Sequence, residues 1–389
     1  MKKLAIVTSH PIQYNAPWFR LLAARKKVQV KVYYTWSQSS GGGQYDPDFG
    51  KHIAWDIPLL DGYDHVFIAN TSIKPSSDHF KGLINPGLNK AIADWAPNAV
   101  LVIRWSFQSH LSCMRYFHKR VPILTRGDST LLDLQPGWRK IMRGIVLRYI
   151  YNLVDCALYV GKHSKDYFKA YGLKEAELIL APHAVDNDRF AETAITIEAG
   201  RQWRKQLSIS ADDLVFLFAG KLEPKKNPAL LLQAFIALDA PGVHLVMVGN
   251  GVQEVVLKNQ YAQHKGIHFV DFKNQSAMPG IYNLCDVFVL PSQGPEETWG
   301  LALNEAMANK RAVIASNKCG GTIDLIIDGE NGYIFESGNM AALVEKMKAM
   351  IDNKDQIAKM GNRSHQIIQQ FSFENICVAI EDVMEKKIK

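Results

Sequence analysis

The sequence alternates short apolar runs with longer segments of helical periodicity, and it does so twice. Such runs, rich in Val, Ile, Leu and Phe, are typical of strands buried on both faces, so they indicate parallel sheets covered by helices. In the first half of the chain the runs begin at Leu4, Val28, Ala99, Val121, Cys156 and Leu178. After the polar stretch TAITIEAGRQWRKQLSISADD they begin again at Leu214, His244, Ile267, Asp286 and Arg311.

The two series of strands predict two domains, because 389 residues exceed what one hydrophobic core usually organises. We expect an α/β protein with two Rossmann-like, doubly wound domains over residues 1–193 and 194–372. A C-terminal helix at about 373–389 would pack back on the first domain. Ligands of such sheets lie beyond the carboxyl ends of the strands, so we expect the site in a cleft between the domains.

Several classes of protein are disfavoured by the sequence. The five cysteines are scattered and never form a CxxC pair, which argues against a disulfide framework and a zinc knuckle. The apolar stretch after Lys3 is too short for a signal peptide, and no run approaches a membrane span of roughly 18 to 20 residues. HExxH, Walker and GxSxG motifs are absent, and TSHPIQY stands where a dinucleotide-binding GxGxxG would follow the first strand. These features favour a cytoplasmic protein.

Positive charge is concentrated in the first half of the chain. Residues 1–195 hold 25 Lys and Arg against 16 Asp and Glu, a net of +9, whereas residues 196–389 hold 20 against 22, a net of −2. In PGWRKIMRGIVLRYIY, residues 136–151, cations interleave with large apolar residues as in a helix lying on an anionic bilayer. A solvated basic helix face is the alternative. Nucleic acid is disfavoured, because no reader motif accompanies the charge.

Two carboxylates stand eight positions apart in PSQGPEETWGLALNEAMA, residues 291–308. Glu297 would lie on the loop that leaves a strand, and Glu305 about two turns into the following helix. A carboxylate among the apolar residues of that helix is costly if it is buried without a partner. Glu305 either belongs to a polar stripe with Asn304 and Asn309 that faces water, or is buried and satisfied by a pair of vicinal hydroxyls such as those of ribose.

Lysines occupy the loop after the strand in LVFLFAGKLEPKKNP, residues 214–228. Lys221 directly follows Gly220, and Lys226 comes five positions later. Together with the N–H groups at the start of the next helix, two ammonium groups there could hold a diphosphate and stabilise the charge that it gains on leaving. The alternative is that these lysines are only solvated. VGNGV, with Gly249 after another strand, is a weak signal because a lone GxG is as often a turn.

In this order and spacing, GKLEPKKN, VGNG, NQSAMPGIYNLCDVFVLPS, PEETWGLALNEAMANKRAVIAS and CGGTIDLIIDGENGYIFESGN resemble the carboxyl-terminal domain of family-4 retaining glycosyltransferases with the GT-B fold. The resemblance covers roughly residues 214–339. It implies a UDP- or GDP-type sugar as donor, bound without a metal, with Glu297 near the sugar, Glu305 on the ribose and both lysines on the diphosphate. TSHPIQYNAPWFR and APHAVDNDRF look like a subset of these enzymes.

The candidate residues fall into three groups. The catalytic candidates are Glu297, Lys221, Lys226 and His10. The donor-binding candidates are Glu305, Gly220, Trp299, Gly300, Leu301, Asn274 and Gly249, with base contacts expected from the backbone of residues 271–275. The acceptor-binding candidates are Arg126, Asp128, Tyr14 and Gln13, within variable loops that include residues 41–50 and 126–130.

This chain departs from the family pattern at two positions. Lys221 stands where many members carry Arg, which keeps the charge but loses the planar fork that grips phosphate. Arg126, in VPILTRGDST, stands where many members carry a His after the fifth strand. His10, in the loop after the first strand, is the proposed substitute, with a capping or core His as the alternative. His110 and His183 are weaker candidates.

Two acidic pairs superficially match a metal-binding DxD motif. They are Asp46-Pro-Asp48 and Asp186-Asn187-Asp188. The Pro in the first pair and the boundary position of the second favour turns and helix caps instead.

The residues and the resemblance together predict a metal-independent retaining glycosyltransferase with a carbohydrate or lipid-linked acceptor. Its basic first domain would face either an anionic acceptor or the inner surface of the cell membrane. The main alternative is a non-catalytic nucleotide-sugar-binding protein of the same fold, because the usual His and Arg are missing. A dinucleotide oxidoreductase shares the sheet architecture but not the motif. A nucleotide-sugar epimerase and a glycogen-type phosphorylase are further alternatives, although the chain is short for the latter. The base, the sugar, the acceptor and the oligomeric state are left open.

Overall fold

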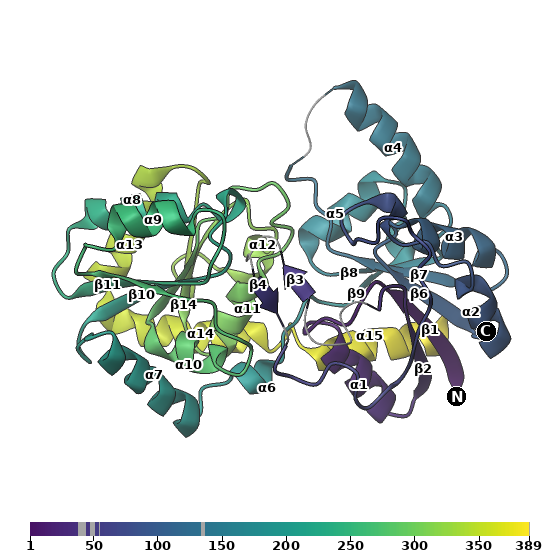
Figure 1. Ribbon diagram of the computed structural model, residues 1–389, viewed down its shortest axis with the longest axis horizontal. Coiled ribbons are helices and arrows are strands. Elements are labelled where there is room, and N and C mark those ends of the chain that lie inside the picture. The colour runs from purple at the N-terminus through teal and green to yellow at the C-terminus, as the bar shows by residue number, and fades with distance from the viewer. Residues whose placement is uncertain (38–43, 47–50, 54, 134–136, 389) are drawn as a thin grey trace. The chain divides into compact units, whose positions relative to one another are not determined.

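The computed structural model describes residues 1–37, 44–46, 51–53, 55–133 and 137–388, with only the backbone given for 44–46, 51–53 and Arg139. The chain forms two compact units, shown in Figure 1. One unit contains residues 1–44, 57–183 and 373–389, and the other contains residues 45–56 and 184–372. The main boundary between the two units therefore lies between residues 183 and 184, ten positions before the expected boundary at 193/194. Most of the expected acceptor loop 41–50, and Asp48 of the first acidic pair, lie outside the described residues.

The first unit is built on a seven-stranded parallel sheet. Its strand order is β5-β2-β1-β6-β7-β8-β9, so β1 is paired on both sides, with Leu4 opposite Val30 and Ala99. Residues 4–7 of β1 and 99–102 of β6 are fully buried, as expected for a sheet covered on both faces. The strands are β1 (Lys2–Thr8), β2 (Val28–Tyr34), β5 (Asp64–Phe67), β6 (Ala99–Ile103), β7 (Ile123–Gly127), β8 (Cys156–Tyr159) and β9 (Leu178–Leu180).

Helices cover this sheet, and one of them comes from the far end of the chain. The helices are α1 (Ala16–Ala24), α2 (Leu88–Trp95), α3 (Gln108–Phe117), α4 (Trp138–Tyr151), α5 (Lys162–Ala170) and α15 (Phe373–Lys386), with short 3-10 turns at Phe80–Gly82 and Glu175–Glu177. α15 packs against α1. Arg25 binds Glu381 through two of its nitrogens, one at 2.8 Å, and also pairs with Glu374. The hydrogen bonds from Arg25 hold the pKa of Glu381 below its usual value.

The second unit has a six-stranded parallel sheet in the order β12-β11-β10-β13-β14-β15. β10 lies in the middle, between β11 and β13, and its side chains are buried along its whole length. The strands are β10 (Leu214–Ala219), β11 (Val243–Val248), β12 (Ile267–Val270), β13 (Val287–Leu290), β14 (Ala312–Ser316) and β15 (Gly332–Phe335). A separate two-stranded sheet joins β3 (Gln44–Asp46) and β4 (Lys51–Ile53).

The helices of the second unit pack on both faces of its sheet. They are α6 (Asn187–Phe190), α7 (Ala194–Gln206), α8 (Pro228–Leu238), α9 (Glu254–Tyr261), α10 (Met278–Leu284), α11 (Leu301–Ala308), α12 (Thr322–Leu325), α13 (Met340–Asp352) and α14 (Ile357–Ile368), with 3-10 turns at Pro224–Lys226 and Lys354–Gln356. None of the helices in the described part of the chain combines the length and the apolarity of a membrane span. All five cysteines are buried free thiols.

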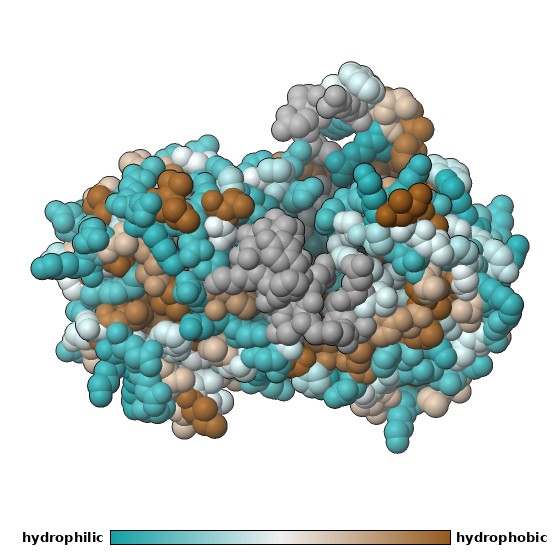
Figure 2. Space-filling model, in the orientation of Figure 1, coloured by the Kyte–Doolittle hydropathy of each residue, from teal (hydrophilic) through white to brown (hydrophobic). Residues whose placement is uncertain are grey.

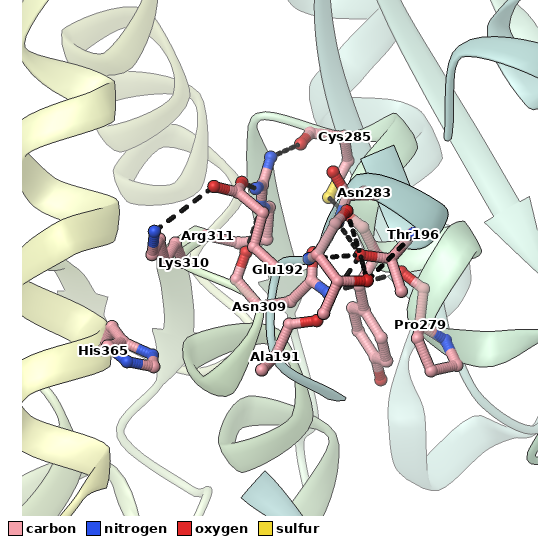
Figure 3. A network of polar contacts seen from close by, with 12 residues as sticks. Ala191, Glu192, Thr196, Pro279, Asn283, Cys285, Asn309, Lys310, Arg311 and His365 are labelled. Carbon is pink, nitrogen blue, oxygen red and sulfur yellow. Dashed lines mark hydrogen bonds and ion pairs between the residues drawn. The ribbon is translucent and has the colours of Figure 1, made fainter. Parts of the chain in front are cut away.

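The segment that enters the second unit is anchored by a polar network beside α11 (Figure 3). Glu192 pairs with Arg311 and, at 3.3 Å, with Lys310. The amide of Asn309 donates to the carbonyl oxygens of Phe190, at 2.6 Å, and of Pro279. Asn309 directly follows α11, so these bonds fix the C-terminal end of the helix that carries Glu305.

Every apolar run predicted as a strand forms one. Within the two parallel sheets, two described strands were missed, namely β5 and β15, and each lies at an edge of its sheet; the short strands β3 and β4 were not predicted either. β5 and β15 both contain partly exposed residues, so neither has the continuous apolar run by which the inner strands are recognised.

Candidate functional site

The loops that leave β10 and β11 lie directly against each other. The N–H of Gly220 donates to the carbonyl oxygen of Val248, and the N–H of Leu222 donates to that of Asn250, both at 3.0 Å. Gly249 has φ 135°, and a Cβ there would come within 2.0 Å of the Gly220 carbonyl oxygen. Only glycine therefore fits at this position. Gly220 and Gly249, both predicted to bind the donor, meet in the structure as close backbone neighbours.

Glu297, on the loop after β13, is buried and paired. The Lys226 ammonium forms an ion pair with Glu297 Oε2, and the Ser292 hydroxyl donates to the same oxygen at 2.9 Å. Lys226 lies on the loop after β10, the strand next to β13, so the two partners come from neighbouring carboxyl ends. A buried carboxylate is tolerated where a cation and a hydroxyl satisfy it. The structure thus brings together two of the residues predicted to be catalytic.

A glycine-containing loop holds the backbone around Glu297. The N–H of Gly320 donates to the Glu297 carbonyl oxygen at 3.0 Å, and the N–H of Gly321 donates to that of Trp299 at 2.9 Å. Glu296 has φ 71°, a left-handed conformation that is costly for a residue with a side chain. The loop is therefore held in one conformation by several constraints, which fix the direction of the Glu297 side chain.

Glu305 is also buried, and it too has a partner. The hydroxyl of Tyr282, in α10, donates to Glu305 Oε2 at 2.7 Å. The water-facing stripe is therefore wrong, because Asn304, Glu305 and Asn309 are all less than 5% exposed. α11 begins at Leu301, so Glu305 lies little more than one turn into the helix and not two. The sequence offered only ribose as a partner for a buried Glu305, whereas Tyr282 already provides one within the fold.

The start of α11 has the geometry expected of a helix that follows a strand-exit loop. Gly300, at the N-cap, has φ 92°, and Leu301 is the first helical residue. The N–H groups of a first helical turn have no partner within the helix, which favours an anion there. The buried Trp299 donates its indole N–H to Asn304 Oδ1 at 2.8 Å.

The Asn274 side chain lies in another loop, the one after β12. Its oxygen accepts a hydrogen bond from the N–H of Gln275 at 2.9 Å and so shapes that loop.

His10 lies in the loop after β1 of the first unit. Its Nδ1 is buried and has no hydrogen-bond partner among the described residues, and its ring stands edge-on to Trp36 at 5.4 Å. Burial, with a smaller contribution from the nearby charge of Arg104, lowers the pKa of His10 to about 4. The imidazole is therefore neutral at pH 7. Gln13, buried, and Tyr14, half-buried, follow in the turn before α1.

Arg126 lies within β7 and is buried. Its Nη2 donates to the carbonyl oxygens of Pro182, at 2.9 Å, and of Ala181, whereas its Nε has no partner among the described residues. Burial lowers the pKa of Arg126 to about 10. Asp128, just after β7, lies 3.8 Å from Nε2 of His183. Burial lowers the pKa of His183, although Asp128 opposes this.

His110 is a structural residue. It is fully buried in α3, its Nδ1 donates to the Arg104 carbonyl oxygen at 2.6 Å, and its Nε2 lies 3.0 Å from the Thr35 hydroxyl. Both ring nitrogens are thus engaged within the fold. The sequence made His110 a weaker candidate than His10, but only the contacts of the folded chain show that it is structural.

The second acidic pair is a helix cap, as predicted. Asp186 is the N-cap of α6, where its Oδ1 accepts from the N–H of Arg189 at 3.1 Å. Within the described residues, no group of three or more His, Cys, Asp or Glu side chains is arranged to hold a metal ion.

We expect the stability of the first unit to depend on His10 below pH 6.5. The unfolded chain binds a proton there at pH 6.5 and the folded chain only at about 4, so the free energy of unfolding falls as the pH falls through this range. His10→Gln should remove up to roughly 3 kcal/mol of that fall. Urea unfolding of both proteins at pH 7.5 and 4.5 measures the difference. An equal decline in both, or a His10 proton resonance that titrates near pH 6.5, would contradict the assignment.

Similarity to known protein families lies mainly in the second unit. Residues 200–367 match the family model described as glycosyl transferases group 1. These residues are similar to group 1 glycosyltransferases. The lipopolysaccharide 1,2-N-acetylglucosaminetransferase of Salmonella typhimurium is 28% identical over 195 residues, which are 47% of this chain and 51% of the relative. The D-inositol 3-phosphate glycosyltransferase 2 of Catenulispora acidiphila is 24% identical over 242 residues, 59% of this chain and 55% of the relative. The chain spans about half the length of these relatives.

Solved structures match nearly the whole chain. Anabaena HepE, in complex with UDP and glucose, superposes with a TM-score of 0.72 at 18% identity, covering 99% of this chain and all of that one. Sucrose-phosphate synthase from Thermosynechococcus elongatus gives 0.73 at 17% identity, covering 99% of each chain. The fold is GT-B. The two Rossmann-like parallel sheets predicted from the sequence are those of this fold.

Proposed function

We propose that the protein is a retaining glycosyltransferase of the family-4 type, from the subset with an N-terminal HPIQY motif. It would move a sugar from a nucleoside-diphosphate sugar to an acceptor hydroxyl. The observation that carries this proposal is the ion pair between the buried Glu297 carboxylate and the partly buried Lys226 ammonium, at the ends of two neighbouring strands in the part of the chain that is similar to group 1 glycosyltransferases. Solved structures of Anabaena HepE hold UDP and UDP-glucose, which supports a donor of this class.

The proposed donor contacts follow from the charges at these strand ends. Lys226, Lys221 and the first turn of α11 would bind the diphosphate and stabilise the negative charge that develops on it. Because Glu297 already holds Lys226 in place, little further ordering would be needed when the donor binds. Glu297 would face the sugar, and Glu305, held by Tyr282, would accept hydrogen bonds from the ribose hydroxyls.

We propose front-side attack for the transfer itself. The bond between the anomeric carbon and the diphosphate oxygen breaks, and the bond to the acceptor oxygen forms on the same face of the sugar. The acceptor proton passes to the departing phosphate oxygen. The lysines and the helix end supply the positive charge, so the reaction would need no metal.

The acceptor is proposed to bind at the carboxyl edge of the first unit's sheet. His10, Gln13, Tyr14, Arg126 and Asp128 lie at the ends of β1 and β7 or in the loops that follow. The neutral His10 could accept a hydrogen bond from a sugar hydroxyl at its unpartnered Nδ1. The net charge of residues 1–195 favours an anionic or lipid-linked acceptor at a membrane, as in polysaccharide, lipopolysaccharide or glycolipid assembly. The name of the Salmonella relative points to the same kind of pathway.

A thermal-shift panel of nucleoside diphosphates and their sugars tests the donor. A ligand at 100 times its Kd stabilises the folded protein by about 2.7 kcal/mol, which should raise the Tm of the unit that binds it by about 5 °C or more. EDTA should not change the shift. If no nucleotide raises the Tm, the proposal is wrong. If a nucleotide sugar raises the Tm, but the protein releases no nucleoside diphosphate from it when extracts that contain acceptors are added, the non-catalytic alternative holds.

A further inference from the structure

Helix α4 of the first unit carries a row of large apolar side chains that the fold leaves exposed. The first turns of the helix stand clear of the rest of the unit in Figure 1, and hydrophobic surface lies over α4 in Figure 2. The row consists of Trp138, Ile141, Met142, Ile145 and Tyr149, each between 50% and 70% exposed. Their spacing of i, i+3, i+4, i+7 and i+11 places them on one face of the helix. We call this row the α4 stripe.

The α4 stripe is distinct from the face by which the helix packs. Leu147 and Tyr151 are buried in the core of the unit. Residues two positions apart point to nearly opposite sides of a helix, so Ile145 and Tyr149 face away from these anchors. The helix therefore has two apolar faces, of which the fold uses one. Single exposed apolar residues are ordinary, but five on one face indicate a surface that binds something.

The charges around the α4 stripe determine what it can bind. Residues 138–151 contain Arg139, Lys140, Arg143 and Arg148 and no Asp or Glu. Among the described side chains, no carboxylate forms an ion pair with Lys140, Arg143 or Arg148. The guanidinium of Arg115, in α3, lies over the Tyr149 ring at 5.4 Å and adds a further positive charge beside the stripe.

We infer that the α4 stripe is a docking surface for an anionic lipid bilayer, into which α4 inserts its apolar face while the flanking cations bind lipid headgroups. A helix in the plane of an interface has this composition, with aromatic residues near its ends and long basic side chains that reach back to the headgroups. A second copy of the chain fits poorly, since two α4 helices would bring eight positive charges together without a carboxylate from either helix.

Vesicle binding tests this inference, and it does so without donor or acceptor, so its outcome is independent of the proposed transferase activity. The full-length protein is sedimented with vesicles of phosphatidylcholine alone or with one third phosphatidylglycerol, at 50 and 500 mM NaCl. We expect binding to the anionic vesicles that weakens with salt. Ile141→Ser with Ile145→Ser should lower the partition coefficient on the order of tenfold or more, because two apolar side chains no longer insert.

The matched control replaces exposed apolar residues elsewhere. Val255 and Val256, in α9, are each about two-thirds exposed, so Val255→Ser with Val256→Ser removes a comparable apolar area far from α4 in the sequence. It should bind vesicles like the unmodified protein. Since the replaced side chains are exposed in both variants, the Tm and the nucleotide-induced thermal shift should be retained. No binding to anionic vesicles, or equal losses in both variants, would overturn the inference. A dimer in light scattering that only the α4 variant loses, without vesicle binding, would assign the stripe to a protein interface instead.

Discussion

Lys226→Ala is expected to slow sugar transfer on the order of 10²-fold or more, with the effect mainly on kcat. Electrostatic stabilisation of the departing group is commonly the largest catalytic contribution, and the proposed departing group is a diphosphate. Lys226 is the cation that the structure places directly on Glu297. Measured initial rates of nucleoside diphosphate release at saturating donor would show the loss. A variant with near-normal turnover would contradict the role of Lys226.

The same substitution also leaves Glu297 without its cation, so a structural effect has to be separated from a catalytic one. Breaking a fully buried ion pair costs about 3 to 5 kcal/mol of stability, since one charge is left uncompensated, and the loss here should be smaller because the Lys226 side chain is 19% exposed. Lys226→Ala combined with Glu297→Gln removes both charges and should recover much of the Tm but none of the transfer. Lys225→Ala is the matched control, because Lys225 lies on the same turn and pairs only loosely with Glu223, at 3.7 Å. It should leave transfer unchanged.

Glu305→Ala is expected to weaken donor binding by roughly 10- to 100-fold, whereas kcat should change less. Hydrogen bonds to a charged group contribute about 1.5 to 3 kcal/mol, and the proposed ribose contact is of this kind. Isothermal titration with the nucleoside diphosphate, which contains the ribose but no sugar, measures the effect directly. Unchanged affinity would remove the ribose assignment.

Tyr282→Phe is the control for that experiment. It removes the hydroxyl that donates to Glu305 but leaves the carboxylate in place. If Glu305 contacts the donor, Tyr282→Phe should keep most of the affinity that Glu305→Ala loses. If the two variants lose affinity equally, Glu305 acts by holding α10 against α11 and not by binding ribose.

The sequence was sufficient to predict the inner strands of both sheets, but only one of the two edge strands of each. β10 and β1 are paired on both sides and buried, so burial imposes an apolar residue at nearly every position, and the pattern is unmistakable. β5 and β15 have one neighbour each and partly exposed side chains. Their sequences, DHVF and GYIF, carry too little of the pattern to be separated from loops.

The candidate site, too, could be predicted only in part from the sequence. Glu297 and Lys226 could be picked out because each follows a strand at the carboxyl edge of one sheet. Their ion pair could not, because it joins loops 71 positions apart. Tyr282 was missed because nothing in its local sequence relates it to Glu305. Ser292 was also missed, although its place two residues after the end of β13 was an available signal.

The position of α15 has a consequence for how the protein is made. It packs against α1, which is synthesised before residues 184–372, whereas α15 itself is synthesised after them. During synthesis, the second unit can therefore fold before α15 has been made. Until then, the residues of α1 that α15 contacts in the folded protein, among them Trp18, remain exposed. Arg25 and Glu381 lie on either side of residues 184–372 in the sequence, so their ion pair can form only after those residues have been synthesised.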